Sequence, residues 1–73
     1  MNEKYFDEKA AAYEAEAKEL EAAAIMKAKY AISAIEEGDF KAAVRMLYEA
    51  AGDANGAGID IARMNDMAAL AEA

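Results

Sequence analysis

The stretch Glu36-Glu37-Gly38-Asp39-Phe40 separates two long segments of the chain, and it decides the fold that the sequence predicts. Before it, residues 3–37 contain no Gly and no Pro, so they predict one helix of roughly 35 residues, about 50 Å long. Gly38 is suited to end that helix, and Asp39 is suited to cap the helix that follows. The chain is therefore predicted to fold back at residues 38–39.

After this turn, apolar residues recur at spacings of three and four and predict a second helix over residues 39–51. Residues 52–58 hold three of the four glycines, which is typical of a flexible turn. A third helix is predicted over residues 60–72, with Asp60 as its N-cap. The predicted fold is a single all-α domain over residues 1–73, with three helices: a long N-terminal helix and two shorter helices packed on its C-terminal half. The predicted core consists of Ile25, Ile32, Ile35, Phe40, Val44, Leu47, Ile61, Met64 and Met67.

Composition excludes several classes of function. The 73 residues include no Cys and no His, which excludes disulfides, thiol chemistry and zinc sites with the usual ligands. Ser33 is the only aliphatic hydroxyl and has no His to activate it, so no enzyme activity is predicted. No apolar run approaches the roughly 20 residues that a membrane span needs, and the N-terminus lacks a secretory signal. We therefore expect a cytoplasmic protein without cofactors.

The N-terminal half of the predicted long helix carries a narrow apolar stripe that has no partner in the three-helix arrangement. Ala and bulky side chains alternate along this stripe at heptad spacing, which would let a second helix approach closely. Acidic residues border the stripe, so another protein with a basic surface fits it better than a second copy, with a homodimer as the alternative. The predicted partner-binding residues are the apolar Phe6, Tyr13 and Leu20 and the acidic Asp7, Glu14 and Glu21.

Residues 53–64 resemble the calcium loop of an EF-hand, with Asp53 at its first position, Asn55 at its third and Gly58 at its sixth. The fifth position is Ala57, which has no side-chain oxygen, and the twelfth is Met64 where a bidentate Glu is needed. We therefore predict no metal site in this segment, which is better explained as a connector between helices.

Residues 24–55 resemble a single tetratricopeptide-type helical hairpin. Ala31 stands at the small position of the first helix, residues 38–40 at the turn, and Ala43 and Ala50 at the two small positions of the second helix. The resemblance implies a peptide-binding or scaffold module. Repeats of this type normally stack in arrays of three or more, so a fragment of a longer helical repeat protein is one alternative.

The charge of −7 is concentrated at the two ends of the chain. Residues 1–22 carry −4, residues 23–51 are balanced, and residues 52–73 carry −3. Carboxylates ordered along a helix can imitate nucleic-acid phosphates and occupy a basic groove, although simple solvated faces remain the alternative. Direct binding of nucleic acid is not expected at this charge.

By size and charge the chain resembles small phage-encoded inhibitors such as anti-CRISPR proteins. That resemblance implies a non-enzymatic inhibitor that docks on a basic groove of a partner protein. The alternative is a homo-oligomerising structural or scaffold protein that assembles through the apolar stripe of residues 6–20.

Overall fold

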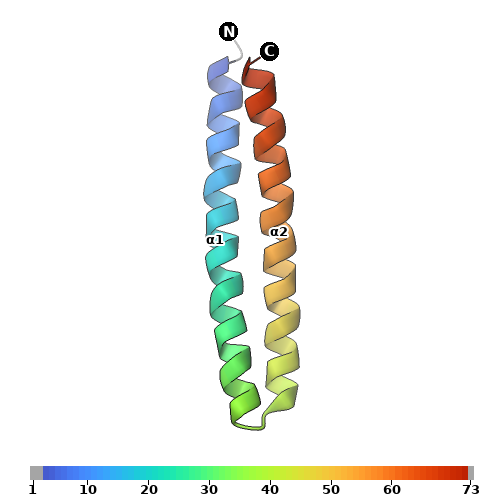
Figure 1. Cartoon of the computed structure of the whole chain (residues 1–73). Coiled ribbons are helices and arrows are strands. Elements are labelled where there is room, and N and C mark those ends of the chain that lie inside the picture. Colours follow the sequence, from blue (N-terminus) through green and yellow to red (C-terminus); the bar gives the residue numbers. More distant parts are fainter. Residues whose placement is uncertain (1–2, 73) are drawn as a thin grey trace.

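The computed structural model describes residues 3–72, which form two long helices joined by one tight turn (Figure 1). Helix α1 spans Glu3–Glu36 and helix α2 spans Phe40–Glu72. The helices run antiparallel, so Glu3 and Glu72 lie at the same end of the hairpin, which we call the open end (Figure 1). The Cα positions extend over 57 × 12 × 11 Å, which describes a rod two helices wide. The predicted all-α class is confirmed.

The turn at residues 37–39 closes α1 and starts α2 through backbone hydrogen bonds. The Asp39 amide donates to the Ala34 carbonyl at 2.8 Å and the Gly38 amide donates to the Ile35 carbonyl at 3.0 Å, the pair of bonds that defines a Schellman motif. Gly38 has a φ of 82°, which glycine adopts without a steric penalty. The Asp39 carboxylate accepts a hydrogen bond from the Ala42 amide at 3.1 Å and so caps α2.

The prediction of three helices is wrong, because α2 continues without a break through the glycine-rich residues 52–58. Each glycine there costs a helix about 1 kcal/mol relative to alanine, but packing against α1 outweighs that cost. Gly56 lies against α1: a Cβ atom built on it would be 3.1 Å from Cδ1 of Leu20. Asp60, predicted as an N-cap, lies inside α2 instead. Since α2 is almost as long as α1, no half of α1 projects beyond its partner.

The two helices pack along a seam in which alanine on one helix usually lies level with a larger side chain on the other. The seam positions recur at alternating steps of three and four residues on both helices, which is the spacing of a coiled coil. The contacts of Leu20 with Gly56, of Tyr13 with Arg63 and of Lys27 with Asp53 set the antiparallel register. This register places Ala17 about level with Asp60, and Leu20 about level with Ala57. The seam positions, all buried or half-buried, are Phe6, Ala10, Tyr13, Ala17, Leu20, Ala24, Lys27, Ala31 and Ala34 of α1 and Ala43, Met46, Ala50, Asp53, Ala57, Asp60, Met64, Met67 and Ala71 of α2.

The predicted core is wrong for most of its residues. Met64 and Met67 do lie half-buried in the seam, but the isoleucines, Phe40, Val44 and Leu47 are exposed. Small side chains take the interior because they let the two helix axes approach closely, and the bulky aliphatic residues occupy positions beside the seam. Among residues 3–72 the buried apolar side chains are all alanines: Ala17, Ala31, Ala43, Ala50 and Ala71.

Candidate interaction surface

The predicted partner-binding stripe on the N-terminal half of α1 faces α2. Phe6, Tyr13 and Leu20 are each half-buried at seam positions. Leu20 lies beside Gly56, and the guanidinium of Arg63 lies 5.9 Å from the centre of the Tyr13 ring. The premise that no second helix remains to cover these side chains is therefore wrong, since the second half of α2 covers them.

The acidic members of the predicted site stay on the outside of the hairpin. Asp7, Glu14 and Glu21 are all exposed, and their spacing of seven residues keeps them along one edge of α1. The Glu14 carboxylate forms an ion pair with Lys18 at 3.3 Å, one helical turn further along. The structure thus separates the two parts of the predicted site: the apolar part lies in the seam and the acidic part lies in solvent. Binding of these acids to a basic partner stays a prediction.

A different apolar surface is open to solvent near the turn. On each helix it forms a second stripe beside the seam, again with steps of three and four residues. Its six large side chains are between 45% and 64% exposed. We call this surface the apolar face, and it consists of Ile25, Ala28, Ile32 and Ile35 of α1 and Phe40, Val44, Leu47 and Ala51 of α2.

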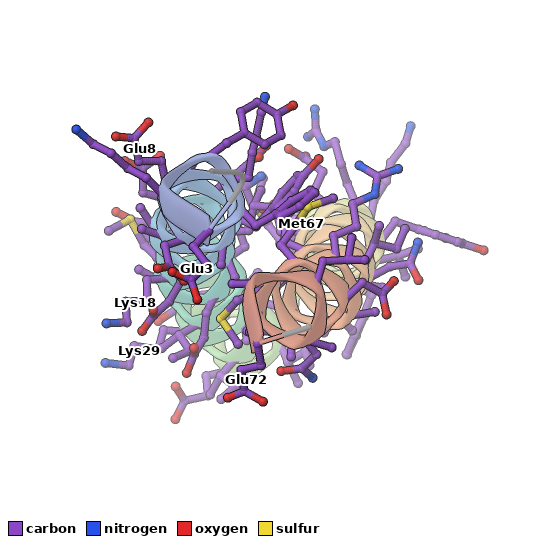
Figure 2. The ribbon with its side chains drawn as sticks, turned by 90° about the horizontal axis from the view of Figure 1, so that it is seen from above. Glu3, Glu8, Lys18, Lys29, Met67 and Glu72 are labelled. Atoms are coloured by element: carbon purple, nitrogen blue, oxygen red, sulfur yellow. The ribbon has the colours of Figure 1, made fainter. Side chains whose placement is uncertain are left out.

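Both stripes of the apolar face lie on the same side of the hairpin. In an antiparallel pair of helices, the positions that follow each core position in the direction of the chain meet across the same flank. A view along the helices agrees with this: Lys18 and Glu72, which continue the two stripes toward the open end, project to the same side of the plane that holds both axes (Figure 2). The two stripes therefore form one continuous surface, two helices wide.

The apolar face ends where the open half of the hairpin begins. Along α1 the same stripe continues toward the open end as Glu21, Lys18 and Glu14, which are exposed and charged. Along α2 it continues through small residues to Ile61, which is 41% exposed, and then becomes polar at Asn65 and Glu72. Apolar character and charge are therefore separated along the length of the rod.

A shallow hollow on α2 lies within the apolar face. It is lined by Val44, Leu47, Tyr48 and Ala51, and no charged side chain contributes to it. The hollow forms because Ala51 is small while its neighbours along the stripe are large, which leaves a gap between successive turns of the helix. A side chain from another helix fits such a gap in the way that knobs fit holes in a helical bundle.

The seam also contains charged residues. Lys27 of α1 donates a hydrogen bond to Asp53 of α2 at 2.7 Å, and its ammonium lies 3.7 Å from a carboxylate oxygen of Glu49. The hydrogen bond to Asp53 raises the pKa of the Lys27 ammonium, while partial burial of the side chain acts in the opposite direction. This cluster pairs one particular turn of α1 with one particular turn of α2, so it favours the observed register.

The seam holds a second buried acid, Asp60, which is only 5% exposed. Its Oδ2 atom has no hydrogen-bond partner among the described residues. Residues 3–72 contain no group of three side chains that could hold a metal ion, so this carboxylate belongs to no such cluster. A buried carboxylate oxygen without a partner is expected to lower the stability of the hairpin.

Comparison with known proteins adds no assignment: no family model matches the chain, and searches of curated proteins and of solved structures found no match. Neither α1 nor α2, over the part of the chain that the structure describes, is long and apolar enough to cross a membrane.

The sequence of α1 already indicates that it carries apolar residues on more than one side, and this pattern predicted two neighbouring helices. Residues 24–35 are apolar around more than one side of α1, which indicates burial against two neighbours. Within residues 3–72, α1 packs against α2 alone. The second neighbour that the pattern indicates is therefore absent from the described hairpin.

Proposed function

We propose that this chain is a non-enzymatic protein-binding module that acts by helix packing through the apolar face. The observation that carries the proposal is the grouping of six large apolar side chains, each about half exposed, on a flank that nothing in residues 3–72 covers. Single exposed apolar residues are common on soluble proteins, whereas contiguous patches of this kind mark interaction sites.

The chemistry of the face determines the kind of partner that it fits. Ridges of Ile, Phe, Val and Leu alternate with small residues, which suits a partner that is itself helical and apolar. Covering the exposed half of one such side chain contributes about 1 kcal/mol to binding. The face itself contains no acidic side chain, and the charged residue that lies closest to it is the basic Lys29, which lines a hollow with Ile25. A basic groove would therefore gain no ion pair on the face.

The acidic open end supports a second function, the inhibitor that docks on a basic surface. Residues 1–22 and 52–73 carry −4 and −3, and Asp7, Glu14 and Glu21 are exposed among them. This function ranks second because α2 covers the apolar side chains that were to anchor the partner. An anionic membrane surface fits the chain less well, since its charge of −7 would be repelled.

A photo-reactive phenylalanine derivative tests the proposal in the intact chain, expressed in its native cells. It replaces Phe40 in one variant and Tyr30 in the matched control, since both are aromatic and about equally exposed, at 64% and 61%. Phe40 belongs to the apolar face, whereas Tyr30 lies on the opposite flank of the hairpin. We expect protein adducts from position 40 and few from position 30. An absence of adducts from position 40, or equal yields from both, would contradict the proposal.

A further inference from the structure

The residues that form the apolar face have the pattern of a protein core. Large aliphatic side chains stand at steps of three and four residues on both helices, with Ala28 and Ala51 between them. Such a double stripe is what one layer of a four-helix bundle presents to the other layer. The hairpin supplies two helices, so two more are needed to complete the arrangement.

We propose that the apolar face is covered by a second copy of this chain. The two hairpins point in opposite directions, so that only the halves next to the turn, residues 23–51 of each copy, overlap. The proposal depends on the protein-binding function proposed above and names its partner. A twofold axis perpendicular to the helices would relate the copies, and each residue of the face would then meet the same surface of its partner.

The composition of the face favours a second copy over a different protein of opposite charge. The face is apolar along its whole length, so its best complement is another surface of the same kind. It also contains both parts that helix packing requires, namely large side chains such as Leu47 and hollows such as the one beside Ala51. A surface that supplies both ridges and hollows can pack against itself.

The size of the face fits a weak dimer whose formation depends on concentration. At 1.5 Å per residue and about 10 Å per helix diameter, the 11 or 12 residues of each stripe make the face roughly 18 Å long and about 20 Å wide. Each copy would then contribute about 350 Å², or roughly 700 Å² in total, which is the size of a weak, concentration-dependent interface. Ile61 extends the face on α2 and adds to this area.

The distribution of charge determines the relative direction of the two copies. The balanced residues 23–51 form the turn half, while the segments with −4 and −3 form the open half. Hairpins pointing in the same direction would place both acidic open halves side by side. Hairpins pointing in opposite directions keep them apart by several Debye lengths, each about 8 Å at physiological ionic strength. Repulsion therefore selects the second arrangement.

Sedimentation equilibrium on the purified full-length chain tests whether the partner is a second copy. We expect a species of twice the 7.8 kDa chain mass at micromolar concentration. Ile32→Glu places a charge on the apolar face and is expected to weaken dimerisation at least a hundredfold. Ser33→Glu adds the same charge to the neighbouring, exposed residue on the other side of α1 and is expected to leave the dimer intact.

Three outcomes would overturn the second copy as partner. The first is a wild-type chain that stays monomeric up to about a millimolar, where binding would contribute only about 4 kcal/mol. The second is a dimer that persists in Ile32→Glu, and the third is an equal loss of the dimer in both variants. Circular dichroism of each variant shows that the helices remain folded. A monomer that still gives cross-links from position 40 would retain the proposed function and remove only the self-association.

The direction of the hairpins is tested with a spin label at a single introduced cysteine, because the chain has no cysteine of its own. Ala12→Cys lies on the exposed surface of α1 toward the open end. Opposed hairpins that share only their turn halves place two such labels about 50 Å apart, whereas hairpins with a common direction place them roughly 25 Å apart. A distance near the shorter value would overturn the opposed arrangement.

Discussion

At the scale of single residues, Asp60 is the most costly feature of the seam. Its carboxylate is 5% exposed, and one oxygen lacks a hydrogen-bond partner among the described residues. Burying an unpartnered polar group costs about 1–3 kcal/mol, so an apolar side chain of similar shape at this position should stabilise the hairpin. A buried polar residue of this kind is retained in other coiled coils because it specifies register, and we expect the same role here.

We predict that Asp60→Leu raises the free energy of unfolding by about 2 kcal/mol. The new leucine would pack against Ala17 in the same way that Leu20 packs against Ala57 in the neighbouring layer of the seam. Urea denaturation at fixed protein concentration measures the change. Asp66→Leu removes the same charge from an exposed position of α2 and should change the free energy by no more than about 0.5 kcal/mol. A less stable Asp60→Leu variant would show that the acid has a favourable partner.

The glycines of α2 also differ from one another. Gly52 has open space around it, so Gly52→Ala should stabilise the helix by about 1 kcal/mol through helix propensity alone. At Gly56 the added methyl group would approach Cδ1 of Leu20 to 3.1 Å, and the leucine would have to shift. We therefore expect a smaller gain from Gly56→Ala in the same urea titration. Equal gains from both variants would mean that the contact with Leu20 is not tight.

At the scale of the helices, the cluster of Lys27, Asp53 and Glu49 links the middle of α1 to the middle of α2. The hydrogen bond to Asp53 raises the pKa of Lys27 in the folded state. A group with a raised pKa contributes stability that is fully present below its unfolded pKa, about 10.4 for lysine, and is lost as the pH rises through the folded value. The contribution is thus predicted to disappear only in strong alkali.

Lys27→Met tests this linkage because it keeps the length of the side chain and removes its charge. The difference in unfolding free energy between wild type and variant should stay constant from pH 7 to about pH 10 and fall above that range. All other ionisable groups are present in both proteins, so their contributions cancel in the difference. A difference that falls between pH 7 and pH 9 would contradict the assignment to Lys27.

Features of the helices that depend on adjacent residues could be predicted from the sequence, whereas features that depend on contacts between the two helices could not. The turn could be predicted because Gly38 and Asp39 end and start helices through contacts with adjacent residues. The alanine and aromatic seam of residues 6–20 was visible as a surface that needs a helical partner. That this partner is α2 was not predictable from helix propensity, since residues 52–58 stay helical through packing against α1.

The choice between the seam and the apolar face could not be made from hydrophobicity. Both are apolar stripes with the same spacing, and ranking residues by size buries isoleucine before alanine. In the structure, alanine is buried and isoleucine is exposed. Two long helices gain more free energy from close approach along their whole length than from enclosing a few large side chains. The close approach occurs at Ala17, Ala31, Ala43 and Ala50. The bulky residues thereby remain available for contacts outside the hairpin.

At the scale of the whole molecule, a hairpin with an all-alanine buried core has little apolar area to stabilise it. Domains of this size are marginally stable, and many depend on oligomerisation. The apolar face contains the larger side chains, so the hairpin should gain stability when the face is covered. Folding and association are then coupled, and the stability of the protein depends on its concentration.

We predict that the thermal midpoint of the wild-type chain rises by roughly 5 °C for each tenfold increase in concentration, from the mass action of a dimer that unfolds to two chains of this length. Ser33→Glu should show the same slope, because its charge lies away from the face. Ile32→Glu should unfold at a lower temperature that does not depend on concentration, since only the monomer remains. Circular dichroism at 222 nm over a hundredfold concentration range measures all three proteins. A flat dependence in the wild type would mean that the hairpin is stable alone, and the alanine seam would then account for the whole of its stability.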